Sequence, residues 1–164
     1  MTKKKDKKSG LISANATVVE NKKARFDYAL EDKFEAGMML VGTEVKSLRL
    51  GQASIAEAYV GPSNGDIFIH NLHIPEYSQA GPKMQHDPKR IKKLLLHKKE
   101  IDKLIGSVAR GGYTIVPTKI YFDAKGRAKI EIALAKGKKL HDKRETEKQR
   151  DWSKQKSRTM RDYN

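Results

Sequence analysis

The stretch that decides the fold runs from Tyr113 to Gly137 and reads YTIVPTKIYFDAKGRAKIEIALAKG. Apolar residues occupy every second position from 128 to 134, and the positions between and after them carry Lys129, Glu131, Ala133 and Ala135. This period of two predicts a half-buried strand with one polar face. The residues before it form its partner in a hairpin. Pro117 interrupts that partner strand, which predicts an edge position or a bulge there.

A second hairpin lies upstream, around Asn64-Gly65. This dipeptide is favoured in a type I′ turn, although Gly61-Pro62 just before it favours a longer loop. The apolar run 67–69 follows as one of its strands. Strand-like β-branched and aromatic residues also occur over residues 12–20 and 25–34.

Two segments carry helical patterns. The segment GTEVKSLRLG (42–51) predicts a short helix that Thr43 caps, with Val45 and Leu48 toward the core. The stronger segment is HDPKRIKKLLLHKKEIDKLIGSVARGG (86–112), which predicts one long helix from Pro88 to the glycine pair at its end. Its apolar residues recur at helical spacing, and its opposite face is rich in lysine.

Hairpins that outnumber helices predict a mainly β fold, a small antiparallel β-barrel with flanking helices. The domain boundaries follow the charge. Residues 1–10 form a basic arm, residues 11–136 contain the core, and residues 137–164 form a charged tail with few large aliphatic side chains. Both ends are expected to be disordered in isolation.

The net charge of the 164-residue chain is +15. Such an excess favours a polyanion as partner, either nucleic acid or an anionic membrane. The sequence contains neither a long apolar run nor a signal-like segment, so we expect no membrane insertion and a cytoplasmic location. Nucleic acid is therefore the leading candidate, and a basic surface that serves solubility alone is the alternative.

No pattern of catalytic or metal-binding residues stands out. Cysteine is absent, and the chain has no Walker loop, Gly-x-Gly-x-x-Gly or Gly-x-Ser-x-Gly segment. His70 and His73 are three apart in or near a strand, which points their rings to opposite faces. We therefore expect no catalytic residue, no metal, no cofactor and no small-molecule substrate.

The chain does carry what RNA recognition requires, namely cations for phosphates and flat groups for unpaired bases. Tyr113, Tyr121 and His141 could provide flat surfaces, although core packing at strand positions is the more common role of such tyrosines. The lysine face of the long helix could likewise be a solvated surface. The cations that we predict to bind RNA are Lys22, Lys89, Lys92, Lys93, Lys119, Arg127, Lys129, Lys136, Lys138 and Lys139.

The tail mixes acidic and basic residues at helical spacings, as in Glu147–Arg150. It lacks a continuous apolar stripe that would dock it on its own domain. This composition is typical of a helix that is marginal in water and forms against a partner, with Trp152 as its anchor. A permanently disordered tail is the alternative.

Several blocks together resemble one known family. They are FEAGMMLVGTEVKSLRLGQASIAEAYV (34–60), HDPKRIKKLLLHKKEI (86–101), GYTIVPTKIYF (112–122), GRAKIEIALAKGKKLHDKRE (126–145) and RDW (150–152). With these blocks the chain resembles the SmpB family of transfer-messenger-RNA (SsrA) binding proteins of bacteria from about Ala16 onward.

The resemblance implies an oligonucleotide-binding (OB) fold and a role in trans-translation, the rescue of ribosomes stalled on messages without a stop codon. Family members hold the tRNA-like domain of transfer-messenger RNA, and elongation factor Tu delivers the aminoacylated complex. Their tail becomes helical in the empty messenger channel.

The resemblance also implies roles for individual residues. Asn21, Glu35, Leu95 and Lys129 match family positions that face the tRNA-like domain, although the spacing of Leu95 by itself favours the core. His141 matches a residue that stacks on a base of small-subunit RNA in the decoding centre. Further residues of the segment needed for tagging are Asp142, Lys143 and Arg144. Many relatives carry Trp where Thr43 stands, so a role for that aromatic does not transfer.

Two other functions fit the composition. A structural or assembly protein of the ribosome would also combine a small barrel with basic ends. An RNA-cleaving enzyme is third, and the lack of a catalytic pattern counts against it.

Overall fold

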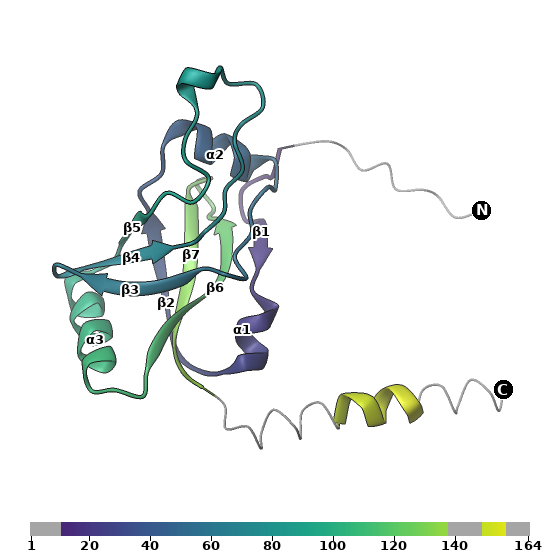
Figure 1. Ribbon diagram of the computed structural model, residues 1–164, viewed down its shortest axis with the longest axis vertical. Helices are drawn as coiled ribbons and strands as arrows, with labels where there is room; N and C mark the ends of the chain where they lie inside the picture. Colours follow the sequence, from purple (N-terminus) through teal and green to yellow (C-terminus); the bar gives the residue numbers. More distant parts are fainter. Residues whose placement is uncertain (1–10, 138–148, 157–164) are drawn as a thin grey trace.

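The computed structural model describes residues 11–137 and 149–156. Within these residues, seven strands form one antiparallel sheet (Figure 1). The strands are β1 (Thr17–Glu20), β2 (Tyr28–Met38), β3 (Tyr59–Ser63), β4 (Asp66–His70), β5 (Lys92–Leu95), β6 (Thr114–Phe122) and β7 (Ala128–Gly137). The helices are α1 (Lys22–Asp27), α2 (Gly42–Arg49), α3 (Lys98–Ala109), the 3-10 turn η1 (Pro82–Met84) and the helical residues 149–156.

The sheet closes on itself. Its order is β1-β6-β3-β4-β5-β2-β7, and β6 also pairs with β7. Six strands therefore form a ring, and β1 adds to β6 beside β3. Closure leaves fewer free backbone edges than an open sheet would. The predicted mainly β antiparallel fold with flanking helices is confirmed.

The sequence pattern predicted two hairpins, and β6–β7 is the one with more residue pairs. Its register joins Thr114 to Ala135 and Phe122 to Ala128, with a shift between Pro117 and Lys119. The predicted bulge at Pro117 is thus confirmed. Asn21 uses this bulge: its backbone amide donates to Thr118 O at 2.7 Å and its side-chain amide donates to Pro117 O at 3.0 Å.

Both faces of β7 are buried from Ile132 to Ala135, which corrects the predicted polar face over these residues, whereas Lys129 and Glu131 remain partly exposed. Ile130, Ile132 and Leu134 join the main core inside the ring. Ala133 and Ala135 point the other way and pack with Ala24 of α1 and Val116 in a second small cluster. Small side chains let α1 lie close to the sheet, and the period of two does not tell such a face from a solvated one.

The β3–β4 hairpin has a two-residue turn. Asn64 and Gly65 both have positive φ, +50° and +80°, as a type I′ turn requires. Gly61 and Pro62 lie within β3, paired with Phe68 and Ile67, so the longer loop that they favoured is wrong. The twist of the I′ turn matches that of the strands, and five residue pairs form without further loop residues.

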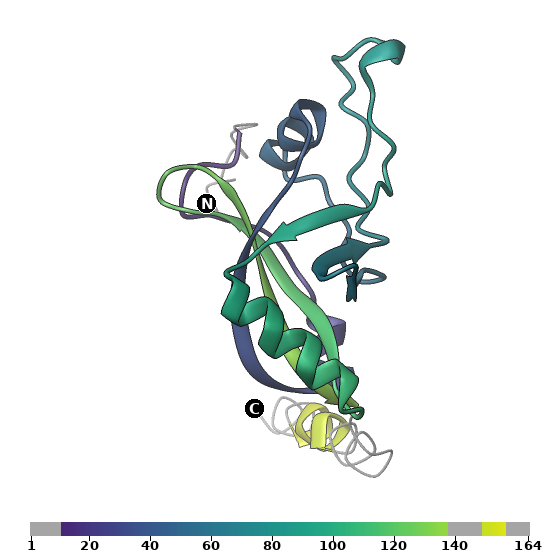
Figure 2. The ribbon, with the colours of Figure 1, turned by 90° about the vertical axis from the view of Figure 1, so that its left-hand side faces the viewer.

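The long helix predicted over residues 88–110 is wrong in its first half. Residues 92–95 are strand β5, which pairs with β4 through Leu94–Ile67 and with β2 through Leu95–Gly37. The helix α3 begins only after His97, buries Leu104 completely, and lies along the lower part of the ring (Figure 2). Apolar residues at 91, 94 and 95 fit either a helix or a strand. Residues 92–95 form the strand because they pair with both β4 and β2.

Two smaller predictions also change. Residues 25–27 belong to α1 rather than to a strand, because the side chain of Asn21 accepts from the Ala24 amide and starts a helix there. At α2 the N-cap position is Val41 rather than Thr43, and Glu44 accepts from the Val41 amide at 2.9 Å. Leu48 is buried, as predicted, and Gly51 follows the helix with φ +76°. No described helix has the length and apolar character needed to span a membrane.

Candidate nucleic-acid interface

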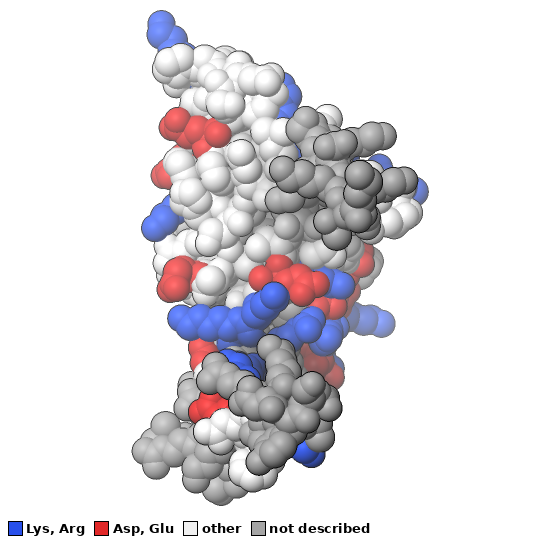
Figure 3. Space-filling model, turned by 90° about the vertical axis from the view of Figure 1, so that its right-hand side faces the viewer, with Lys and Arg blue, Asp and Glu red and all other residues white. Residues whose placement is uncertain are grey.

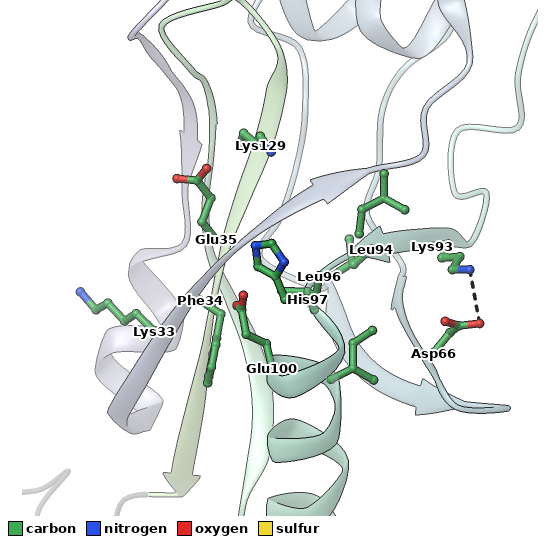
Figure 4. Close-up of a pocket in the computed structure, with 12 residues that line it drawn as sticks. Lys33, Phe34, Glu35, Asp66, Lys93, Leu94, Leu96, His97, Glu100 and Lys129 are labelled. Carbon is green, nitrogen blue, oxygen red and sulfur yellow. Dashed lines mark ion pairs between the residues drawn. The ribbon is translucent and has the colours of Figure 1, made fainter.

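A groove of about 660 Å³ runs along the outside of the ring where β2, β5, β7 and the start of α3 meet. It brings together four residues that the sequence predicted to bind RNA, Glu35, Lys93, Leu95 and Lys129. Figure 4 shows Glu35 and Lys129 at one end, the Lys93–Asp66 ion pair at the other, and His97 between them. The strand pairing places these residues together although they lie far apart in the sequence.

The outer face of β2, β7 and β6 continues this groove. The register sets Glu35 opposite Glu131 and Glu131 opposite Lys119, and in the adjacent row sets Lys129 opposite Tyr121. The Tyr121 hydroxyl donates to Glu35 Oε2 across the intervening strand. The Lys119 ammonium lies 5.3 Å from the centre of the Tyr121 ring. Cations, two carboxylates and an aromatic side chain thus share one surface.

The exposure of Leu95 decides between the core position that its spacing favoured and a position on the surface. Leu95 is 50% exposed, whereas its neighbour Leu94 is 1% exposed. The Leu95 side chain lies over Gly37 of β2, where a Cβ would meet Leu95 Cβ at 3.3 Å. Leu95 is therefore a surface residue of the groove, and its apolar side chain is available to a base or a sugar.

The lysines of the groove differ in whether an acidic side chain forms an ion pair with them. Lys93 Nζ lies 3.3 Å from Asp66 Oδ2, and both side chains are partly exposed. Lys129 has no ion-pair partner among the residues that the structure describes. Of these two lysines, Lys129 is therefore the one whose charge no described acidic side chain neutralises.

Lys92 is not an RNA ligand, which corrects the prediction. Its side chain is 0% exposed, and its ammonium lies 3.2 Å from Glu44 Oε2 and donates to Arg90 O at 2.7 Å. That ion pair compensates Oε2, which accepts no well-aligned hydrogen bond from the described residues. A strand alternates its side chains between two faces, so Lys93 lies outside and Lys92 inside.

Glu44 is the centre of this buried charge cluster. Arg90 Nη2 donates to Glu44 Oε1 at 2.7 Å and also to Met39 O at 2.8 Å. Burial alone would raise the pKa of Glu44, but the hydrogen bonds from Arg90 and the Val41 amide, with the charge of Lys92, lower it. Burial lowers the pKa of Lys92, and Glu44 opposes this shift. The cluster ties α2 to β5 and is structural.

Asn21 is also internal. It is 5% exposed, its side-chain oxygen caps α1, and its side-chain nitrogen donates to Pro117 O at the bulge, so it holds α1 against β6. Lys22 follows it on the exposed side of α1 with Lys23 and Arg25. Figure 3 shows Lys and Arg side chains gathered across the lower half of this face, where α1 lies in Figure 1. This second cationic area is separate from the groove.

The remaining predicted cations lie apart from the groove. Lys89 is exposed in the segment between β4 and β5, and its backbone amide donates to Asp87 at 2.9 Å. Arg127 pairs with Asp123 at 3.0 Å in the β6–β7 turn. The Lys136 ammonium lies 4.6 Å from the centre of the Tyr113 ring.

Most of the predicted tail site lies outside the described residues, namely Lys138, Lys139, His141, Asp142, Lys143 and Arg144. Trp152 lies in the helical residues 149–156 and is 70% exposed. In the same helix the Arg150 guanidinium lies 5.1 Å from the centre of the Phe26 ring on α1.

The groove also contains residues that sequence reasoning missed, chiefly Lys33, Phe34, His97 and Glu100. His97 is the N-cap residue of α3. Reading residues 88–110 as one helix hid the break at this residue. A polar residue between three consecutive leucines and a second helical pattern was the available signal. Among the described residues, no cluster of three or more His, Cys, Asp or Glu side chains could hold a metal ion.

The fold and the groove define a class: a small closed antiparallel β domain of a strongly basic chain, whose outer groove combines lysines, carboxylates and apolar side chains. Comparison with known proteins specifies the family. The model of the SmpB protein family matches residues 18–162, and the chain belongs to this family.

Individual relatives agree. The SsrA-binding protein of Afipia carboxidovorans is 60% identical over 144 residues, which cover 88% of this chain and 91% of the relative. That of Allorhizobium ampelinum is 58% identical over 149 residues, with 91% and 94% covered. A solved chain, described as "tmRNA-SmpB: a journey to the center of the bacterial ribosome", matches with a TM-score of 0.63 and 44% identity. That match covers 76% of this chain and 87% of the solved one.

Proposed function

We propose that this protein is an RNA-binding adaptor of trans-translation. It binds the tRNA-like domain of transfer-messenger RNA, the SsrA RNA after which its relatives are named, and brings that RNA to stalled ribosomes. The observation that carries the proposal is the groove, in which Glu35, Leu95 and Lys129 meet on one surface.

The chemistry of the groove supports this function. Lys129 provides an uncompensated cation for phosphate, Leu95 an apolar surface, and Glu35 an acceptor for base edges. A site that served only charge neutralisation would not place the carboxylate of Glu35 at the same end as Lys129. The combination suits a folded RNA that presents both backbone and unpaired bases.

The finer steps belong to the same proposal. Elongation factor Tu meets the protein through the aminoacylated RNA complex, in the cytoplasm. The tail enters the decoding centre, where His141 stacks on a base of small-subunit RNA, and Asp142, Lys143 and Arg144 act in tagging. Trp152 anchors the tail helix in the messenger channel. The protein acts by binding and carries out no reaction of its own.

The test is capture of RNA by the immobilised full-length chain from a bacterial extract, followed by sequencing. We expect one dominant RNA with a tRNA-like end. The double variant Glu35→Ala/Lys129→Ala should lose most of this RNA without loss of folding, since both residues lie on the surface. The control Glu76→Ala/Lys83→Ala changes the same charges in the exposed segment between β4 and β5, and should capture as well as the parent.

A ribosomal structural protein would behave differently in this experiment. It would recover ribosomal RNA in place of the tRNA-like RNA and would remain in stoichiometric amount on salt-washed ribosomes. Either result would contradict the adaptor function.

A further inference from the structure

A carboxylate beside Lys129 on a surface proposed to bind RNA needs an explanation. Glu35 is exposed on β2, and it faces Glu131 directly across the strand pair. Like charges directly opposite each other destabilise a sheet, so this arrangement does not serve stability. A carboxylate also repels phosphate, so Glu35 can contribute to RNA binding only by accepting hydrogen bonds from donors of the RNA.

The structure holds Glu35 in one orientation. The hydroxyl of Tyr121, on β6, reaches across β7 and donates to Glu35 Oε2. Among the described residues this is the only hydrogen-bond donor to the Glu35 carboxylate. The opposed Glu131 is held in the same way by the hydroxyl of Thr118, also on β6. Two hydroxyl groups of one strand therefore fix the two acids.

Tyr121 is itself held in place. Its ring is partly buried on the sheet, with the Lys119 ammonium 5.3 Å from the ring centre and Lys129 opposite it in the register. Burial, together with the hydrogen bond to Glu35 and the charges of Glu35 and Glu131, raises the pKa of the Tyr121 hydroxyl. The hydroxyl therefore stays protonated, and it remains a donor at any pH at which the protein works.

We infer that Tyr121 is a positioning residue, which holds the Glu35 carboxylate so that it accepts a hydrogen bond from the exocyclic amino group of an unpaired RNA base. The inference rests on the proposed function and adds the way in which the groove selects its RNA. Lys129 and Lys119 neutralise phosphates and read no sequence, whereas an oriented carboxylate can accept from the exocyclic amino group of adenine, cytosine or guanine, a group that uracil lacks.

The test uses the full-length chain with Tyr121→Phe, Glu35→Gln and the double variant. The probes are a transcript of the tRNA-like domain and a scrambled transcript of the same length. Loss of the hydroxyl should weaken binding of the tRNA-like transcript about fivefold, the effect of one hydrogen bond. Glu35→Gln should weaken it about tenfold, as for one base contact. The double variant should be no weaker than Glu35→Gln, because Tyr121 acts only through Glu35.

Three further measurements separate positioning from a general structural role. The thermal midpoint should not fall in Glu35→Gln, because this change removes a like-charge pair. The salt dependence of binding should be unchanged in both single variants, since neither contacts phosphate. In both single variants, the affinity for the tRNA-like transcript should fall relative to the affinity for the scrambled transcript. Tyr77→Phe, which loses a hydroxyl bonded to Gln79 at 3.0 Å in the segment between β4 and β5, is the matched control.

Additive losses in the double variant, or unchanged affinity in Tyr121→Phe, would overturn the inference and leave the proposed function intact. A parent protein that binds both transcripts equally would overturn the proposed function and this inference with it.

Discussion

At the scale of single residues, β5 shows how one strand divides its side chains between core and surface. Lys92 and Leu94 point into the molecule, while Lys93 and Leu95 point into the groove. The two leucines are adjacent and chemically identical, yet one is buried and the other half exposed. Substituting each leucine in turn therefore distinguishes an effect on stability from an effect on RNA binding.

The first prediction uses this pair. Leu94→Ala should lower the free energy of unfolding by about 2–5 kcal/mol, because it leaves a cavity in the core. Leu95→Ala should change it by less than about 0.5 kcal/mol but weaken binding of the tRNA-like RNA. Urea unfolding and RNA titration measure the two effects. Equal destabilisation by both changes would contradict the exposed position of Leu95.

The second prediction concerns the buried carboxylate of Glu44. Its pKa is lowered in the folded protein, so its ion pairs contribute stability above the ordinary glutamate pKa and lose it as the pH falls through the lowered value. Glu44→Gln should therefore cost about 3–5 kcal/mol at neutral pH, since it leaves Lys92 buried without its partner.

The cost should shrink as the pH falls from the ordinary glutamate pKa through the lowered pKa of folded Glu44, because the parent carboxylate then takes up a proton, first in the unfolded chain and then in the folded one. Urea unfolding at several pH values measures it. Glu57→Gln is the control, since Glu57 forms only an exposed pair with Lys23 at 3.8 Å. A cost for Glu44→Gln that does not depend on pH would show that packing, and not charge, holds the cluster together.

At the scale of elements, the join between α1 and β6 depends on one side chain. Asn21 caps α1 through the Ala24 amide and binds Pro117 O at the bulge. The third prediction is that Asn21→Ala lowers the free energy of unfolding by about 1–2 kcal/mol, the range for a lost cap. Asn21→Ser retains a capping oxygen and should lose less.

Hydrogen exchange locates this effect. The Ala24 amide should exchange faster in Asn21→Ala than in the parent, while amides in β3 and β4 should be unchanged. RNA binding should weaken only to the extent that α1 is lost, because Asn21 itself is buried. A large loss of binding with α1 intact would mean that Asn21 contacts RNA directly.

At the scale of the whole molecule, we expect RNA binding and tagging to depend on different parts of the chain, the folded body and the C-terminal tail. The fourth prediction is that a chain ending at Gly137 still binds the tRNA-like RNA but no longer supports tagging of stalled products. The cut follows Gly137 because this residue pairs with Tyr28 and completes β7. Normal tagging by the shortened chain would contradict the division between body and tail.

Salt dependence belongs to the same scale. Binding of the tRNA-like RNA should weaken linearly on a log–log plot against salt, with a slope of about −0.7 to −0.9 per neutralised phosphate. Lys129→Met should reduce the slope by about one such unit. A slope that does not change would remove Lys129 from the phosphate contacts.

The sequence by itself determined the hairpins, the bulge at Pro117 and the basic character of the surface. These are local properties: alternation along a strand, the φ values that Asn64-Gly65 adopts, a missing amide at proline, and a sum of charges. The family blocks added Glu35, Leu95 and Lys129, and all three lie in one groove.

Only the tertiary structure decided the rest. Residues 91–95 fit a helix or a strand equally well, and their partners in β2 and β4 decided for the strand. That choice buried Lys92 against Glu44 and exposed Leu95. Ala133 and Ala135 are buried because α1 packs against them. The sheet register brings the Tyr121 hydroxyl to the Glu35 carboxylate. Each outcome depends on a partner distant in the sequence, and a pattern read along one segment carries no information about that partner.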